Sequence, residues 1–113
     1  MTPAMQTKLW FWQRASAVVL ALLVVVHLAL IVYAVHGGLT AAQILGRTRG
    51  SAAFAAFYAL FVLACAIHVP VGLSAVAREW LRWSERGANA LALAIAALIV
   101  VAGLRAVYAV SVG

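Results

Sequence analysis

The sequence predicts an all-α integral membrane protein of three transmembrane helices that form part of a larger helix bundle. Of its 113 residues, 68% are hydrophobic and only 9% are charged, whereas a soluble domain is about 45–50% apolar and about 25% charged. A chain this short buries only a small fraction of its surface on folding. Lipid must therefore cover much of the apolar surface, and we expect residues 1–113 to form a single membrane-anchor domain.

Three long apolar runs are the expected membrane spans, and they cover residues 15–35, 52–77 and 88–110. Each run has the ~20 residues that a helix needs to cross ~30 Å of hydrocarbon. The first run is longer than the apolar core of a cleaved signal peptide, and no clear small-residue cleavage motif follows it. The sequence shows neither strand-like alternation nor an internal repeat.

Polar connectors separate the three runs. The first connector, residues 36–51, is rich in Gly and Thr, and Gly37 and Gly38 are expected to stop the first helix. The second connector, residues 78–87, is charged. Inside the second span, Pro70 has no amide proton to donate. We expect it to kink that helix or to leave a carbonyl group of the preceding turn free for a neighbour.

The basic residues near the span ends predict the orientation. Five of them flank the start of the first span and the second connector: Lys8, Arg14, Arg78, Arg82 and Arg86. Only Arg47 and Arg49 lie in the first connector. Because cytoplasmic loops carry the excess of Lys and Arg, we expect an inner membrane of bacterial type, with the N-terminus in the cytoplasm and the C-terminus outside. The net charge of +6 then reflects topology and does not indicate nucleic-acid binding.

Two histidines, His27 and His68, lie within the apolar runs. On ideal helices His27 is ~20 Å from Arg14, and His68 is ~15 Å from Arg78. We therefore expect both imidazoles in the hydrocarbon zone, at depths within about one turn of each other. Titratable side chains are costly there and usually serve a function. His36, at the outer end of the first span, is expected to be interfacial.

Three interpretations of the membrane histidines stay open. They could be ordinary hydrogen-bonded helix contacts, or a proton relay, although the only acids, Glu79 and Glu85, lie at the rim. They could also be axial ligands of haem iron, which need neutral imidazoles in an apolar site. Gly72, one turn after His68, belongs to a stripe of small residues that favours a flat ring there, but such stripes also serve close helix packing.

Arg105 is the other costly residue in a span. It lies in the last third of the third run and is followed by Tyr108. Its side chain could extend to the outer interface. It could instead pair with a haem propionate.

Two short motifs resemble a known family. Residues 68–80 resemble the second transmembrane helix of the cytochrome b membrane-anchor subunit of succinate dehydrogenase or fumarate reductase. That helix carries His-x-x-x-Gly-(Leu/Ile), followed by an acid and an aromatic residue, and the matching residues here are His68, Gly72, Leu73, Glu79 and Trp80. Residues 12–17 are similar to the family's His-Arg-x-Ser-Gly motif at the start of the first helix. Arg14 and Ser16 match, whereas Gln13 and Ala17 depart from it.

The resemblance implies a haem b-containing anchor subunit that passes electrons from an iron–sulfur subunit to a membrane quinone, ubiquinone or menaquinone. The expected partners are that iron–sulfur subunit, a flavoprotein subunit, and a second anchor chain or another copy of this one. Because the chain has no nucleotide motif and no cysteine cluster, it would not itself oxidise succinate. Fumarate reduction remains an alternative direction, and a haem-free small transporter or scaffold remains an alternative class.

The resemblance also implies roles for individual residues around a haem. His68 is expected to be an axial ligand of the iron, with Gly72 beside the ring. His27 is expected to be a ligand too, either of the same haem or of a second haem nearer the outer face. Arg105 would then pair with a propionate.

A second set of residues is expected at a quinone site. The resemblance places Arg14 and Ser16 near the quinone. A quinone that gains electrons develops negative charge on its oxygens, which Arg14 can stabilise. We expect Trp12 or Trp80 to pack against the quinone ring, and Glu79 to supply protons from the cytoplasm.

Overall fold

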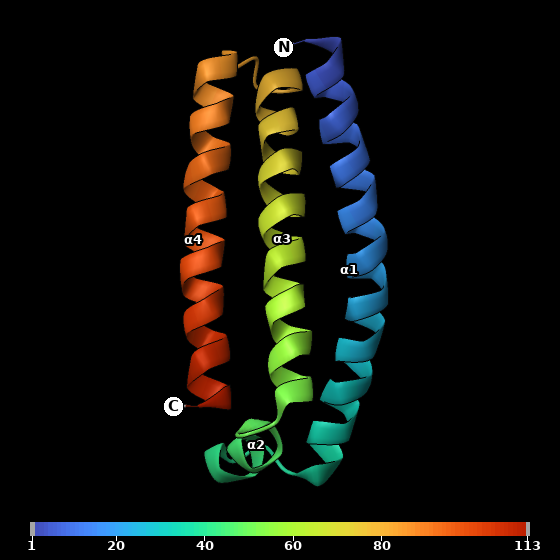
Figure 1. Ribbon diagram of the computed structural model, residues 1–113, viewed down its shortest axis with the longest axis vertical. Coiled ribbons are helices and arrows are strands. Elements are labelled where there is room, and N and C mark those ends of the chain that lie inside the picture. Colours follow the sequence, from blue (N-terminus) through green and yellow to red (C-terminus); the bar gives the residue numbers. More distant parts are fainter. Residues whose placement is uncertain (1, 113) are drawn as a thin grey trace.

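The computed structural model, which describes residues 2–112, contains three long helices and one short helix over that range (Figure 1). Their bounds are Pro3–Gly37 for α1, Ala41–Thr48 for α2, Ala52–Glu79 for α3 and Glu85–Ser111 for α4. The described chain contains no strand. The three long helices are each long and apolar enough to span a membrane. The predicted all-α, three-span fold is therefore confirmed.

The first helix, α1, begins twelve residues earlier than the apolar run 15–35 indicates. Thr2 caps its start, because the Thr2 side chain accepts a hydrogen bond of 3.2 Å from the amide of Met5. Pro3 occupies the first turn, where an amide proton has no helical partner in any case. The helix ends at Gly37, as predicted, and Gly38 follows with φ of 109°, a conformation that favours glycine.

The first connector contains a helix, α2, that was not predicted. A reciprocal capping box begins it: the Thr40 side chain accepts from the amide of Gln43, and the Thr40 amide donates to Oε1 of Gln43. The Thr40-x-x-Gln43 pattern is visible in the sequence. Hydropathy does not reveal the helix, because its eight residues are too few to cross a membrane.

The short helix α2 lies across the end of the bundle and is bonded to the end of α4 (Figure 1). The Thr48 hydroxyl donates to the carbonyl of Val110 at 2.7 Å, and the Gly50 amide donates to the carbonyl of Ser111 at 2.9 Å. The last carbonyl groups of a helix have no partner within it. The first connector supplies partners for two of those in α4.

The central long helix is α3, which packs against both α1 and α4 (Figure 1). It is one continuous helix through the buried Pro70. Small residues allow the close approach of α3 and α4. At Gly103 an added Cβ would lie 2.6 Å from a methyl carbon of Val62. In the described chain, no large side chain is fully buried, so lipid or partner helices must cover the apolar flanks.

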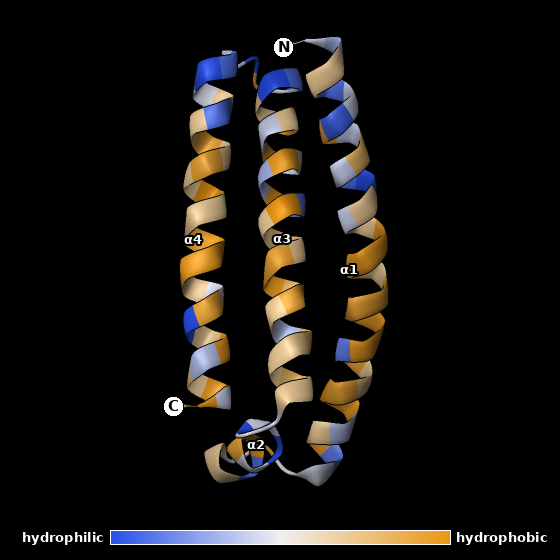
Figure 2. Cartoon of the chain, viewed as in Figure 1, coloured by the Kyte–Doolittle hydropathy of each residue, from blue (hydrophilic) through white to orange (hydrophobic). Residues whose placement is uncertain are grey.

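Polar residues gather at the two ends of the bundle (Figure 2). One end holds the start of α1 and the junction between α3 and α4, and the other holds α2. Hydrophobic residues dominate between them. The orientation prediction used seven basic residues, and five of them lie in the first part of α1 or around the junction of α3 and α4. This is the end predicted to face the cytoplasm.

We predict that Gly103→Ala destabilises the protein by about 1–3 kcal/mol, as expected for overpacking. The reason is the overlap of the new methyl group with Val62. Thermal unfolding in detergent would measure the loss, with Gly46→Ala as control, since a Cβ at Gly46 meets nothing within 4 Å. Adding Val62→Ala should recover part of the loss. Equal stability of the Gly103→Ala and Gly46→Ala variants would contradict the close packing.

Candidate functional site

His68, on α3, faces the buried Ser16 on α1. The His68 Nδ1 atom lies 3.4 Å from the Ser16 Oγ atom. The same hydroxyl donates to the backbone carbonyl of Gln13 at 3.1 Å. Ser16 is only 5% exposed. This contact joins two helices within their apolar sections and engages one ring nitrogen of His68.

The other ring nitrogen of His68, Nε2, has no hydrogen-bond partner among the described residues. The enclosed polar side-chain atoms without a partner in that part of the chain are Gln13 Oε1, His27 Nδ1 and Ser111 Oγ. His68 Nε2 is not among them, and the His68 side chain is partly exposed. This nitrogen is therefore not fully enclosed by the described chain.

Gly72, one turn after His68, faces Gln13 of α1. An added Cβ at Gly72 would lie 3.2 Å from Nε2 of Gln13. The space left by the missing side chain thus admits the Gln13 amide and lets α1 approach α3. Within this chain the absence of a side chain at Gly72 serves helix packing.

His27 lies further along the bundle, beside two aromatic residues of α3. Its ring centre is 6.0 Å from that of Tyr58 and 5.5 Å from that of Phe61, and both rings are nearly perpendicular to it. His27 is eleven residues after Ser16, the partner of His68. At 1.5 Å per residue that is about 16 Å along α1. The prediction that the two histidines lie at comparable depth is therefore wrong.

The physical reason is the register of α1 against α3. The prediction took Arg14 and Arg78 as markers of one membrane boundary. In the structure Gln13 lies opposite Gly72, so Arg14 lies about seven residues deeper than Arg78, or about 10 Å. Apolar length and flanking charge do not determine this offset, whereas contacts between the helices do.

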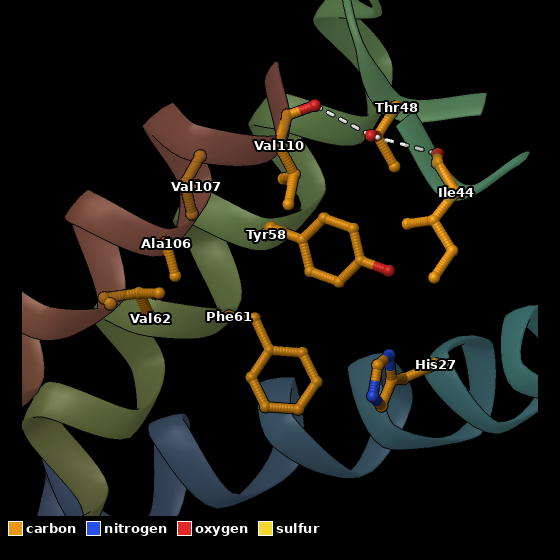
Figure 3. A pocket seen from close by; sticks show the side chains of 10 residues that line it. His27, Ile44, Thr48, Tyr58, Phe61, Val62, Ala106, Val107 and Val110 are labelled. Carbon is orange, nitrogen blue, oxygen red and sulfur yellow. Dashed lines mark hydrogen bonds between the residues drawn. The ribbon is translucent and has the colours of Figure 1, made fainter. Parts of the chain in front are cut away.

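The pocket beside His27 is apolar and has a volume of about 350 Å³. All four helices line it: His27 comes from α1, Thr48 from α2, Tyr58 and Phe61 from α3, and Val107 from α4 (Figure 3). The Thr48 hydroxyl bonds to backbone carbonyl groups. The enclosed Nδ1 of His27 has no partner in the described chain.

A second pocket, of about 270 Å³, lies between α1 and the last turns of α3. Trp10, Gln13 and Arg14 line it from α1, and Arg78 and Glu79 from α3. The Arg14 guanidinium group lies 5.2 Å from the centre of the Trp10 ring, in a cation–π contact. We refer to this cavity as the rim pocket, because it lies near the basic end of the bundle.

The rim pocket brings together only part of the predicted quinone set. Arg14 and Glu79 line it. Ser16 does not, because it is buried against His68. Trp12 contacts Phe11 edge-on, and Trp80 is 80% exposed; neither lines the pocket.

Sequence reasoning missed Trp10, Gln13 and Arg78 as lining residues. Arg78 was taken only as a topology charge, and Gln13 only as a departure from a motif. A signal was present, because Gln13, Ser16 and His27 follow one another at intervals of three and eleven residues. These intervals are close to whole helical turns and place the three polar residues on one face of α1.

Arg105 lies apart from both pockets. Its side chain is exposed and lines a shallow hollow with Tyr108 and Leu104 on α4. The α4 residues beside His27, such as Val107, lie on another face of the helix. The structure therefore does not bring Arg105 to His27. No group of three or more metal-ligating side chains occurs among residues 2–112.

The model of the family described as succinate dehydrogenase/fumarate reductase transmembrane subunit matches residues 1–106. No curated protein and no solved structure matches the chain.

We predict that paired cysteines report the register of α1 and α3. In a Cys65→Ala background, Ser16→Cys with His68→Cys should be joined by a short bifunctional thiol reagent. His27→Cys with His68→Cys should not, because about 16 Å separates those levels. Mass spectrometry of the digested protein would identify the joined peptides, with His27→Cys and Phe61→Cys as the positive control. Efficient joining of the His27 and His68 positions would contradict this register and support the prediction that the two histidines lie at the same depth.

Proposed function

Because the chain belongs to the succinate dehydrogenase/fumarate reductase transmembrane subunit family, we propose that it is the haem b-containing membrane anchor of a succinate dehydrogenase. In that role it passes electrons from an iron–sulfur subunit to a membrane quinone. Fumarate reductase, which runs the reverse reaction, is the second candidate and would use the same groups. The observation that carries the proposal is His68, an imidazole in the apolar zone with one ring nitrogen engaged and the other neither bonded nor fully enclosed in the described chain.

The surroundings of His68 fit a haem ligand. A metal-bound histidine almost always has a hydrogen-bond partner on its other ring nitrogen, and Ser16 provides one. His68 would hold the iron through Nε2. Bound haem would supply a one-electron carrier inside the bilayer.

The second axial ligand would come from another chain. His27 lies about 16 Å further along α1, so it cannot bind the opposite side of the same iron. Its enclosed Nδ1 also has no partner in the described chain, so a second haem at His27 has weaker support. A second anchor chain or another copy of this one would cover the exposed flanks of the helices and supply the missing ligand.

The rim pocket is the proposed quinone site. Arg14 provides positive charge to quinone oxygens that become negative on reduction. The Trp10 ring, beneath the guanidinium group, helps to hold Arg14 in place. Glu79 is exposed and can exchange protons with water. Trp10 takes the aromatic role expected of Trp12 or Trp80.

The proposed partners would bind at the basic end of the bundle. The start of α1 and the junction of α3 with α4 carry most of the basic residues, so by the positive-inside rule this end faces the cytoplasm. Trp80 and Trp83 are exposed there. An iron–sulfur subunit seated at this end, with its flavoprotein, would deliver electrons beside the rim pocket.

We predict that His68→Ala abolishes or weakens the b-type haem signal in the reduced-minus-oxidised spectrum of the purified complex. The reason is the loss of the proposed axial ligand. His36→Ala is the control, because His36 is exposed and its Nδ1 bonds only within its own helix, to the carbonyl of Val32. An unchanged spectrum in His68→Ala would reject this assignment. A wild-type complex without a Soret band would favour a haem-free scaffold.

We predict that Arg14→Ala lowers kcat/KM for quinone about tenfold to a hundredfold, the usual effect of removing a hydrogen bond to a charged group. Succinate oxidation with a soluble artificial acceptor should be unchanged, because that acceptor bypasses the rim pocket. Arg82→Ala is the control, since Arg82 lies at the same end but does not line the pocket. Equal losses with both acceptors would instead indicate a role of Arg14 in assembly.

A further inference from the structure

We infer that Ser16 is a positioning residue for His68: its hydroxyl oxygen holds the imidazole in the tautomer with the proton on Nδ1, which leaves Nε2 to bind iron. This inference rests on the proposed function, because it assumes that His68 binds haem. It assigns Ser16 to the histidine instead of to the quinone.

The assignment follows from counting protons. A serine hydroxyl has one proton and can also accept hydrogen bonds, whereas a backbone carbonyl can only accept. The Ser16 Oγ atom lies 3.1 Å from the Gln13 carbonyl and 3.4 Å from His68 Nδ1. The shorter contact takes the hydroxyl proton. The longer contact then requires a proton on Nδ1, which donates to Ser16.

The opposite tautomer is disfavoured by its unpaired proton. A neutral imidazole carries one proton, on Nδ1 or on Nε2. A proton on Nε2 would have no acceptor within residues 2–112, because no hydrogen bond there involves that atom. An unpaired donor is costly in an apolar environment. With the proton on Nδ1, the donor is satisfied and Nε2 carries a lone pair.

The burial of Ser16 makes it a fixed partner. Its side chain is 5% exposed between α1 and α3, so bulk water cannot replace the hydroxyl. Its second hydrogen bond, to the carbonyl one turn earlier, holds the oxygen in place. The contact with His68 is long for an N–H···O hydrogen bond. It therefore orients the ring and polarises it modestly.

The contact has an electronic consequence for a bound iron. An acceptor on Nδ1–H makes the opposite nitrogen a more basic ligand. A more basic ligand stabilises the oxidised, more positive iron. Removing the Ser16 oxygen should therefore favour the reduced iron and raise the midpoint potential of the haem.

The test compares two buried serines. Ser16→Ala removes the oxygen beside His68. Ser74→Ala is the matched control, because Ser74 is also 5% exposed and donates only within its own helix, to the carbonyl of Val71. In the purified complex we expect Ser16→Ala to raise the midpoint potential and lower the haem content. Ser74→Ala should match the wild type, and Ser16→Thr, which keeps the hydroxyl, should restore the wild-type potential.

The outcomes separate this inference from the proposed function. Haem that depends on His68 but has the same potential in Ser16→Ala as in the wild type would overturn the inference alone. A wild-type complex without haem would overturn both. Should Ser16→Ala fail to assemble, Ser16→Cys keeps a similar side chain with a weak acceptor. A raised potential in Ser16→Cys, with the wild-type value in Ser16→Thr, would support the role of the oxygen, and unchanged values in both would overturn it.

Discussion

The arrangement of the site depends on how α1 meets α3. Polar side chains in the apolar zone need partners within the protein, because hydrocarbon offers none. Ser16 meets His68, and Gln13 fits against Gly72, where a larger residue would crowd it. These two contacts, one turn apart, set the register of the helices. The register in turn brings the Gln13 side chain into the rim pocket beside Arg14.

The same register gives the two histidines different environments. His68 has a buried oxygen beside one nitrogen, whereas His27 lies among aromatic rings with an enclosed, unpartnered nitrogen. The pocket at His27 lies near α2, the helix bonded to the last carbonyl groups of α4. The histidine with the hydrogen-bond partner is the one nearer the rim pocket. The proposed electron carrier and the proposed quinone site therefore share one half of the bundle. Gln13 links them, because its backbone carbonyl accepts from Ser16, the partner of His68, and its side chain lines the rim pocket.

Much of the fold could be predicted from the sequence, because lipid imposes a minimum length and an apolar composition on each span. Hydropathy located all three spans but not the polar start of α1 or the short helix α2, whose signal was the Thr40-x-x-Gln43 capping box. The resemblance correctly indicated the family. It could not determine the neighbours of Ser16, because a motif gives a position along a helix and not the helix that faces it. The positions of the basic residues beside the apolar runs likewise could not show that Arg14 lies deeper than Arg78.

The open flanks of the bundle bear on the proposed haem. All three long helices expose large apolar side chains, and α1, which packs only against α3, exposes most of its own. An iron held in a porphyrin can take ligands on both sides of the ring plane, and this chain offers one well-supported histidine. His27 is excluded from the same iron by its distance along α1, and its enclosed Nδ1 has no hydrogen-bond partner in the described chain. A site that is half complete, on a bundle whose flanks are uncovered, fits an anchor in which the haem lies between this chain and a partner.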